Sequence, residues 1–251
     1  MTVEQLARIL DNEIPTELSE SWDNDGRIII PDPEAEVTKV LCALDCTSVA
    51  IDFAVKNGCN VIVTHHPLIF KPIGSLTADD SVGKRVIECV KRGIAVLSYH
   101  TRLDSIKGGV NDTLADLLGI ENTEAFLPFG RIGDVDEQSF YDFAKKTAEA
   151  LSLDICSLGL VKATETVKRV AVISGCGKDE INEVINAGAD TFVTGEVMHN
   201  HMIDCKELGL NLICGTHYAT ERIIVPVLAD IIGKYVPCEV YQFVKESEYG
   251  I

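Results

Sequence analysis

Short apolar runs of four to eight residues alternate along the chain with longer segments of helical periodicity. Because a helix between two buried strands usually joins parallel neighbours, this alternation is typical of an α/β fold. We expect a first amphipathic helix near the N-terminus, where Leu6, Ile9 and Leu10 share one face. We expect strands at residues 37–44, 60–63, 94–98, 167–173, 191–193, 210–214 and 240–244. We expect further helices at residues 47–57, 81–92, 111–118, 138–151, 179–187, 197–207 and 220–233.

An internal repeat indicates how these elements are grouped. Residues 37–64 match residues 167–194 without a gap, with seven identities in 28 positions. So few identities also arise by chance between unrelated βαβ units, but each copy leads on to another helix and another apolar strand. Pro and Gly residues cluster within residues 120–135. We therefore predict two similar α/β domains with mainly parallel sheets, the first at residues 1–125 plus 215–251 and the second at residues 126–214.

The composition excludes several classes of protein. There are 39 Asp and Glu against 22 Lys and Arg, a net charge of −17, which would repel a nucleic-acid backbone. No apolar stretch reaches the ~18 residues of a membrane span, and the N-terminus does not resemble a signal peptide. The nine cysteines are scattered without a CxxC pair, so we expect reduced thiols. We expect a cytoplasmic protein without membrane or nucleic-acid partners.

The histidines follow the ends of predicted strands. His65 and His66 follow residues 60–63, His100 follows residues 94–98, and His217 follows residues 210–214. Ligand sites of open parallel sheets form at this edge, because the connecting loops diverge there. Pro67 favours a turn in which both adjacent imidazoles reach one crevice. The remaining two histidines, at positions 199 and 201, follow a predicted helix start and are weaker candidates.

Carboxylates accompany two of these histidines at helical spacing. Glu221 lies four residues after His217, and Asp104 lies four residues after His100. On a helix this spacing places both side chains on one face. Imidazoles and carboxylates without thiolates suit Zn, Fe, Mn or Co, and a bridging carboxylate favours a two-metal centre. A single histidine at a strand end is more often structural, but the combination favours metal binding.

Five segments together resemble the ordered motifs of the Nif-three-like family, whose members include GTP cyclohydrolase I type 2 homologues. The segments are Trp22-Asp-Asn-Asp-Gly26, Thr64-His-His-Pro67, His100-Thr-Arg-Leu-Asp104 with Gly108-Gly-Val-Asn-Asp112, Thr194-Gly-Glu196 and His217-Tyr-Ala-Thr-Glu221. The resemblance implies two similar α/β domains, a dinuclear metal site in the cleft between them, and a ring-shaped homohexamer. It implies the metal ligands His65, His66, Asp104, His217 and Glu221, with Glu221 as the bridge.

Two functional hypotheses follow from this resemblance. The first is a metal-dependent hydrolase with two divalent ions per chain (Zn, Fe or Mn), acting on a nucleotide or phosphoester, with GTP ring opening as the family's named reaction. In it, His100 would carry protons and Glu196 would be a base or a support, although Glu196 is equally well explained as a carboxylate at a helix N-terminus. The alternative is a non-enzymatic metal-binding or metal-handling hexameric scaffold for protein contacts.

Three other features have open interpretations. Trp22 to Asn24 either form an aromatic contact with an Asx turn or line the rim of the site. The glycine-rich residues 174–178 either form a plain strand-to-helix turn or hold a phosphate. Asp25 and Arg27 stand where the family usually has apolar residues, which makes them candidates for altering the rim.

Overall fold

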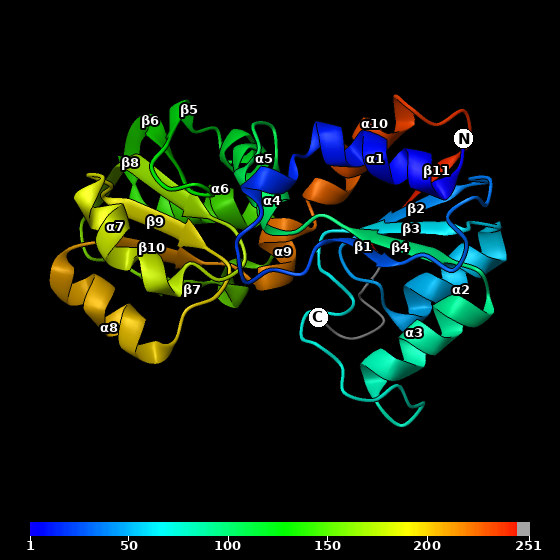
Figure 1. The fold of residues 1–251 in the computed structure, drawn as a ribbon. Coiled ribbons are helices and arrows are strands. Elements are labelled where there is room, and N and C mark those ends of the chain that lie inside the picture. Colours follow the sequence, from blue (N-terminus) through cyan, green and yellow to red (C-terminus); the bar gives the residue numbers. More distant parts are fainter. Residues whose placement is uncertain (245–251) are drawn as a thin grey trace. The chain divides into compact units, whose positions relative to one another are not determined.

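The computed structural model describes residues 1–244 and contains two compact units. Unit 1 consists of Met1–Ile106 and the segment from Ile224 onward, and unit 2 consists of Lys107–Ile223. Each unit has its own sheet with helices packed on it, which confirms the α/β fold class (Figure 1). The unit boundaries differ from the expected positions at 125/126 and 214/215.

The sheet of unit 1 is mainly parallel. Its strands follow the order β1-β4-β3-β2-β11, in which only β1 is antiparallel to its neighbour. The strands are β1 (Gly26–Ile29), β2 (Val40–Ala43), β3 (Val61–Thr64), β4 (Ala95–Ser98) and β11 (Val240–Phe243). Every residue of β2, β3 and β4 is buried, as expected for strands covered on both faces.

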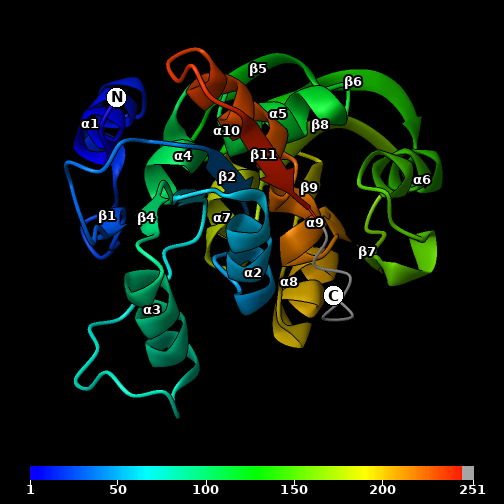
Figure 2. The ribbon, with the colours of Figure 1, turned by 90° about the vertical axis from the view of Figure 1, so that its right-hand side faces the viewer.

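Helices cover both faces of this sheet. They are α1 (Val3–Glu13), α2 (Ser48–Asn57), α3 (Ser81–Lys91), α4 (Thr101–Ser105) and α10 (Ile224–Gly233), with a 3₁₀ turn η1 (Thr16–Leu18). In Figures 1 and 2, α2 and α3 lie along the same side of the sheet, and their apolar residues share one core cluster with β2 and β3. Leu6 and Leu10 of α1 are fully buried, as its amphipathic pattern predicts.

The sheet of unit 2 is mixed, which corrects the expectation of mainly parallel strands there. Its order is β5-β6-β8-β9-β10-β7, and only the β8-β9 and β9-β10 pairs are parallel. The strands are β5 (Glu121–Ala125), β6 (Arg131–Ser139), β7 (Gly159–Val161), β8 (Thr166–Ile173), β9 (Thr191–Thr194) and β10 (Asn211–Cys214). Pro128 and Gly130 of the Pro and Gly cluster lie in the short β5-β6 connection, because antiparallel strands need only a tight turn, and Gly133 lies within β6.

Alternating side chains of β8 pack in two different cores. Val170 and Val172 face one cluster with the apolar residues of α5 (Val110–Leu117), α6 (Phe140–Ala150) and α9 (His217–Glu221). Ala171 and Ile173 face the other with α7 (Ile181–Asn186) and α8 (His199–Leu208). This two-residue period is that of a strand buried on both faces. Short 3₁₀ turns, η2 (Ile155–Ser157) and η3 (Lys178–Glu180), complete unit 2.

The internal repeat corresponds to two βαβ units, β2-α2-β3 in unit 1 and β8-α7-β9 in unit 2. The matched glycines Gly58 and Gly188 follow the two helices with φ of 73° and 84°, a conformation that ends a helix at little cost only for glycine. The matched glycine therefore ends the helix in both copies of the repeat.

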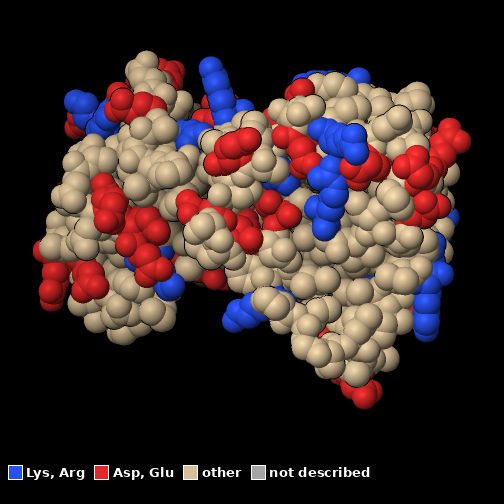
Figure 3. Space-filling view, viewed as in Figure 1, with Lys and Arg blue, Asp and Glu red and all other residues tan. Residues whose placement is uncertain are grey.

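The surface and the thiols agree with the composition. Acidic side chains are spread over the face shown in Figure 3, on both units. All nine cysteines lie within the described residues as free thiols, and six of them are buried. None of the helices in residues 1–244 is long and apolar enough to cross a membrane.

Candidate metal centre

Two adjacent imidazoles lie at the carboxyl end of β3. The chain leaves the strand after Thr64, whose hydroxyl donates a hydrogen bond to the carbonyl oxygen of His66 at 2.7 Å. The turn brings the rings of His65 and His66 to a centroid distance of 4.9 Å, so they do not point to opposite faces. The side chain of His65 is fully buried and that of His66 is partly exposed.

Both imidazoles are oriented through Nδ1. His65 Nδ1 lies 3.0 Å from the carbonyl oxygen of Tyr99, and His66 Nδ1 lies 3.0 Å from Oδ1 of Asp45. A carbonyl oxygen only accepts hydrogen bonds, so Nδ1 of His65 carries a proton, and in the neutral ring Nε2 carries the lone pair. This is the arrangement of many metal-binding histidines, in which the second ring nitrogen is held by an oxygen of the protein. His65 Nε2 lies 3.7 Å from Asp104 Oδ1.

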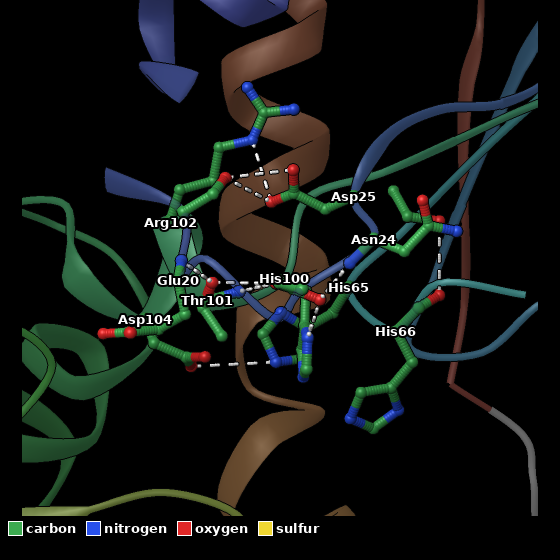
Figure 4. A network of polar contacts seen from close by, with 12 residues as sticks. Glu20, Asn24, Asp25, His65, His66, His100, Thr101, Arg102 and Asp104 are labelled. Atoms are coloured by element: carbon green, nitrogen blue, oxygen red, sulfur yellow. Dashed lines mark hydrogen bonds and ion pairs between the residues drawn. The ribbon is translucent and has the colours of Figure 1, made fainter. Parts of the chain in front are cut away.

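His100 joins this pair at the start of α4. Its ring centroid lies 5.2 Å from that of His65 and 5.6 Å from that of His66. One nitrogen from each of the three rings lies within 4.8 Å of the others (Figure 4). Unit 1 therefore holds three imidazoles and the Asp104 carboxylate in one cluster.

Asp23 fixes the orientation of His100, a role that the sequence analysis did not assign. Its carboxylate lies 2.9 Å from His100 Nδ1 and accepts hydrogen bonds from the backbone N–H and the hydroxyl of Thr101. Burial raises the pKa of Asp23, but the hydrogen bond and charge of His100 and the Thr101 bonds outweigh it and lower the pKa to about 2. The only sequence signal for this role was the Trp-Asp-Asn motif.

Helix α4 is anchored by a buried guanidinium. Arg102 is fully buried and donates from Nε to Asp25 at 3.0 Å (Figure 4). It also donates from one terminal nitrogen to Asp11 and to the carbonyl oxygen of Ile14. Asp25 is thus a partner of Arg102. The other unusual residue, Arg27, pairs with Glu4 and Asp11. Both unusual residues belong to an ionic network that supports the backbone between His100 and Asp104.

Unit 2 contributes a histidine and a glutamate from α9. Thr216 caps this helix by accepting a hydrogen bond from the N–H of Ala219, and the turn places His217 Nε2 3.0 Å from Glu221 Oε2. His217 Nδ1 lies 3.4 Å from the carboxylate of Glu196. Glu221 is only 4% exposed. Glu196 therefore contacts the far side of the His217 ring.

The glycine-rich loop after β8 packs against this pair. Gly175 has φ +60°, and a Cβ at this position would lie 2.1 Å from Glu221 Oε1 and 3.2 Å from His217 Nε2. The loop N–H groups donate to side chains, that of Ser174 to Asn111 and that of Gly175 to Thr220. The N–H of Gly177 donates to the hydroxyl of Thr194. Because these three amides already have acceptors, they are not available to a phosphate, and the bond from Gly175 to Thr220 connects the loop to α9.

Two histidines stand apart from these clusters. His199 and His201 lie on α8, and within residues 1–244 neither belongs to a group of donors close enough to share an ion. The ring of His201 accepts a hydrogen bond from the N–H of Met198, so it caps the helix.

The donors of each unit fit a divalent transition metal. Unit 1 offers imidazole nitrogens and one carboxylate, and unit 2 offers one imidazole and one buried carboxylate. Neutral imidazoles with carboxylates are typical ligands of Zn, Fe and Mn. The absence of a side chain at Gly175 leaves the space that the Glu221 carboxylate occupies.

Comparisons with known proteins identify close relatives of this architecture. A model of the family Duf34/NIF3 (NGG1p interacting factor 3) matches residues 1–247. A protein of Clostridium perfringens called GTP cyclohydrolase 1 type 2 homolog is 32% identical over 248 residues, covering 93% of this chain and 91% of the relative.

Solved structures agree with the sequence comparison. The crystal structure of a Bacillus cereus protein related to NIF3 matches with a TM-score of 0.90 at 22% identity, over 97% of this chain and 96% of that one. Staphylococcus aureus protein SA1388 matches with a TM-score of 0.89 at 27% identity, over the same shares.

Proposed function

We propose, since the chain belongs to the Duf34/NIF3 family, that it is a metal-dependent hydrolase whose two units together hold two divalent ions. The proposed ligands are His65, His66 and Asp104 from unit 1 and His217 and Glu221 from unit 2, with Glu221 as the bridge. Zn, Fe and Mn are the candidate metals.

The orientation of His65 carries this proposal. Its Nδ1 is held by the Tyr99 carbonyl oxygen and its ring is fully buried. Nε2 therefore has a fixed direction in which it can ligate a metal ion. A histidine with only a structural role does not need a second imidazole and a carboxylate beside that nitrogen. Here the His66 ring and the Asp104 carboxylate lie next to it.

The chemistry follows from this donor set. Two such ions, when bound, supply an activated water at neutral pH and polarise a substrate oxygen or ring carbon. In this proposal His100 accepts and releases a proton at Nε2, because Asp23 holds its Nδ1. Glu196 orients His217 through Nδ1 and is a positioning residue. The substrate class that we propose is a nucleotide or a phosphoester, with GTP as the first candidate because of the name of the Clostridium relative.

The assembly and location are part of the same proposal. We propose a homohexamer in the cytoplasm, as the family resemblance implies. Light scattering of untagged protein would give the mass of the assembly, and a monomer or dimer at micromolar concentration would contradict it.

Turnover by metal-loaded protein tests the hydrolase. Formate release from GTP and nitrophenol release from nitrophenyl phosphate are measured with Zn, Fe and Mn in turn. We expect one of these activities in the wild type and its loss in Glu221→Gln. His199→Ala is the matched control, because this histidine lies on α8 outside the donor groups. Metal binding without turnover of either substrate class would favour the non-enzymatic scaffold.

A further inference from the structure

Two exposed aromatic side chains adjoin the histidine cluster of unit 1. Trp22 is 59% exposed and Phe70 is 44% exposed, although both are large apolar side chains. Trp22 is the single tryptophan of the chain. An exposed aromatic pair next to a cluster of metal-binding residues is a candidate surface for a ligand.

The rings of Trp22, Phe70 and His100 form an aromatic corner. Their centroids lie 6.0 to 6.2 Å apart in all three pairs. The planes cross at 75° between Trp22 and Phe70, at 78° between Trp22 and His100, and at 85° between Phe70 and His100. A flat ligand can therefore lie face to face with one ring and present its edge to the other two, the two geometries that aromatic pairs prefer.

Hydrogen bonds hold the backbone on both sides of this corner. Asp23, next to Trp22, binds His100 and Thr101. Asn24 donates from its amide to the carbonyl oxygen of Ile69, next to Phe70, and so links the two segments. The exposed rings thus project from a backbone that is held by hydrogen bonds. A ligand that stacks on them therefore loses little binding free energy to the ordering of these segments.

We propose that Trp22 and Phe70 bind a planar heteroaromatic ring of the substrate by stacking and hold it beside His100. The inference rests on the proposed function, because it names the part of the substrate that this site recognises. Every nucleobase has a π face, and stacking on aromatic side chains tolerates different bases. We therefore expect the corner to accept purine rings in general and to discriminate against substrates that lack an aromatic ring.

The fluorescence of Trp22 tests this directly, because the single indole reports on its own surroundings. GMP and AMP are titrated into metal-free and metal-loaded protein, and ribose 5-phosphate is the probe without an aromatic base. The indole is excited at the red edge of its band, and free tryptophan corrects for absorption by the bases. We expect saturable quenching by both nucleotides and none by ribose 5-phosphate.

Variants separate stacking from general effects. Phe70→Leu should weaken nucleotide binding about tenfold, the change that corresponds to about 1.4 kcal/mol. Trp22→Leu, measured by equilibrium dialysis, should weaken it at least as much. Tyr141→Leu removes an aromatic side chain of unit 2 that is 58% exposed and should change nothing. Circular dichroism of each variant verifies that it is folded.

The outcomes distinguish this inference from the hydrolase proposal. Equal quenching by ribose 5-phosphate, absence of saturable quenching, or an unchanged dissociation constant in folded Phe70→Leu would overturn the stacking site. If phosphoesters without an aromatic ring are hydrolysed while nucleotides do not bind, the hydrolase stands and the stacking site fails. If nucleotides bind through Trp22 and Phe70 but metal-loaded protein turns over neither GTP nor nitrophenyl phosphate, the stacking site stands and the hydrolase fails.

Discussion

Gly175 illustrates how a single residue is determined by the side chains around it. Its φ of +60° disfavours any side chain, and Glu221 Oε1 already occupies the place of a Cβ. In the sequence the glycine-rich loop suggested a phosphate cradle or a turn. Spacing could not distinguish these, because the acceptors of its amides come from residues as far as 63 positions away.

Gly175→Ala should displace the Glu221 carboxylate and reduce metal binding. We also expect a loss of about 1–3 kcal/mol in the free energy of unfolding, because the backbone is strained for any L side chain. Urea unfolding and metal content measure the two effects. Gly188→Ala is the matched control, with φ +84° and no atom within 4 Å of its Cβ. The Gly188→Ala variant should lose about 1 kcal/mol in the free energy of unfolding and should keep its metal content. Equal metal content in the two variants would contradict this role of Gly175.

Asp23 gives a prediction about pH. Its pKa is lowered to about 2 from 3.8, so it binds protons less readily when the protein is folded. Its contribution to stability is complete above pH 3.8 and is lost as the pH falls through about 2. Asp23→Asn should be less stable than the wild type by about 1–2 kcal/mol at neutral pH. In urea unfolding, this difference should shrink between pH 4 and 2, and a constant difference would refute the assignment.

Among the elements, α4 shows how a short helix is held in place. Five residues form little helix by themselves, so its position depends on tertiary contacts. Arg102 provides them by pairing with Asp25 and Asp11. Asp104 lies two residues after Arg102 on the same helix, so the buried network fixes the backbone that carries it.

Removing one partner of this network should destabilise the fold more than replacing both partners by apolar residues. Asp25→Ala leaves a buried guanidinium with one carboxylate fewer, and we expect a loss of about 3–5 kcal/mol in the free energy of unfolding. The double variant Asp25→Leu with Arg102→Met should lose much less free energy of unfolding. Arg27→Ala, at a partly exposed pair, should lose about 1 kcal/mol or less. Thermal and urea unfolding compare the three, and a double variant as unstable as Asp25→Ala would contradict the model of a buried ion pair.

The elements that could be predicted from sequence are those with a strong apolar period. The strands β2, β3, β4 and β8 to β11 lie within or beside their predicted positions, because each is an apolar run. Strand β5 was missed because all its residues are exposed and mostly polar. It pairs with β6, and the preceding helix α5 packs in the same core cluster as β8, so unit 2 begins at Lys107.

For the whole molecule, the sequence predicted the class of fold and the kind of donor, but not the complete site. The His-x-x-x-Glu spacing at positions 217 and 221 follows from helix geometry, and the structure shows that pair. The full set of five proposed ligands came only from resemblance to a family, because spacing relates residues of one element and not of distant ones. Asp23 lies 77 residues from His100, so no local pattern indicated their contact.

The central proposal is that the ligands proposed in unit 1 and in unit 2 bind two divalent ions per chain. The most direct test is metal content per chain by mass spectrometry, on untagged protein purified without oxygen and compared with His65→Ala, Glu221→Ala and the control His199→Ala. The account predicts about two equivalents of Zn, Fe or Mn in the wild type and the control, and a marked loss in a variant of either unit. Less than about half an equivalent after reconstitution, or full occupancy in both ligand variants, would contradict it.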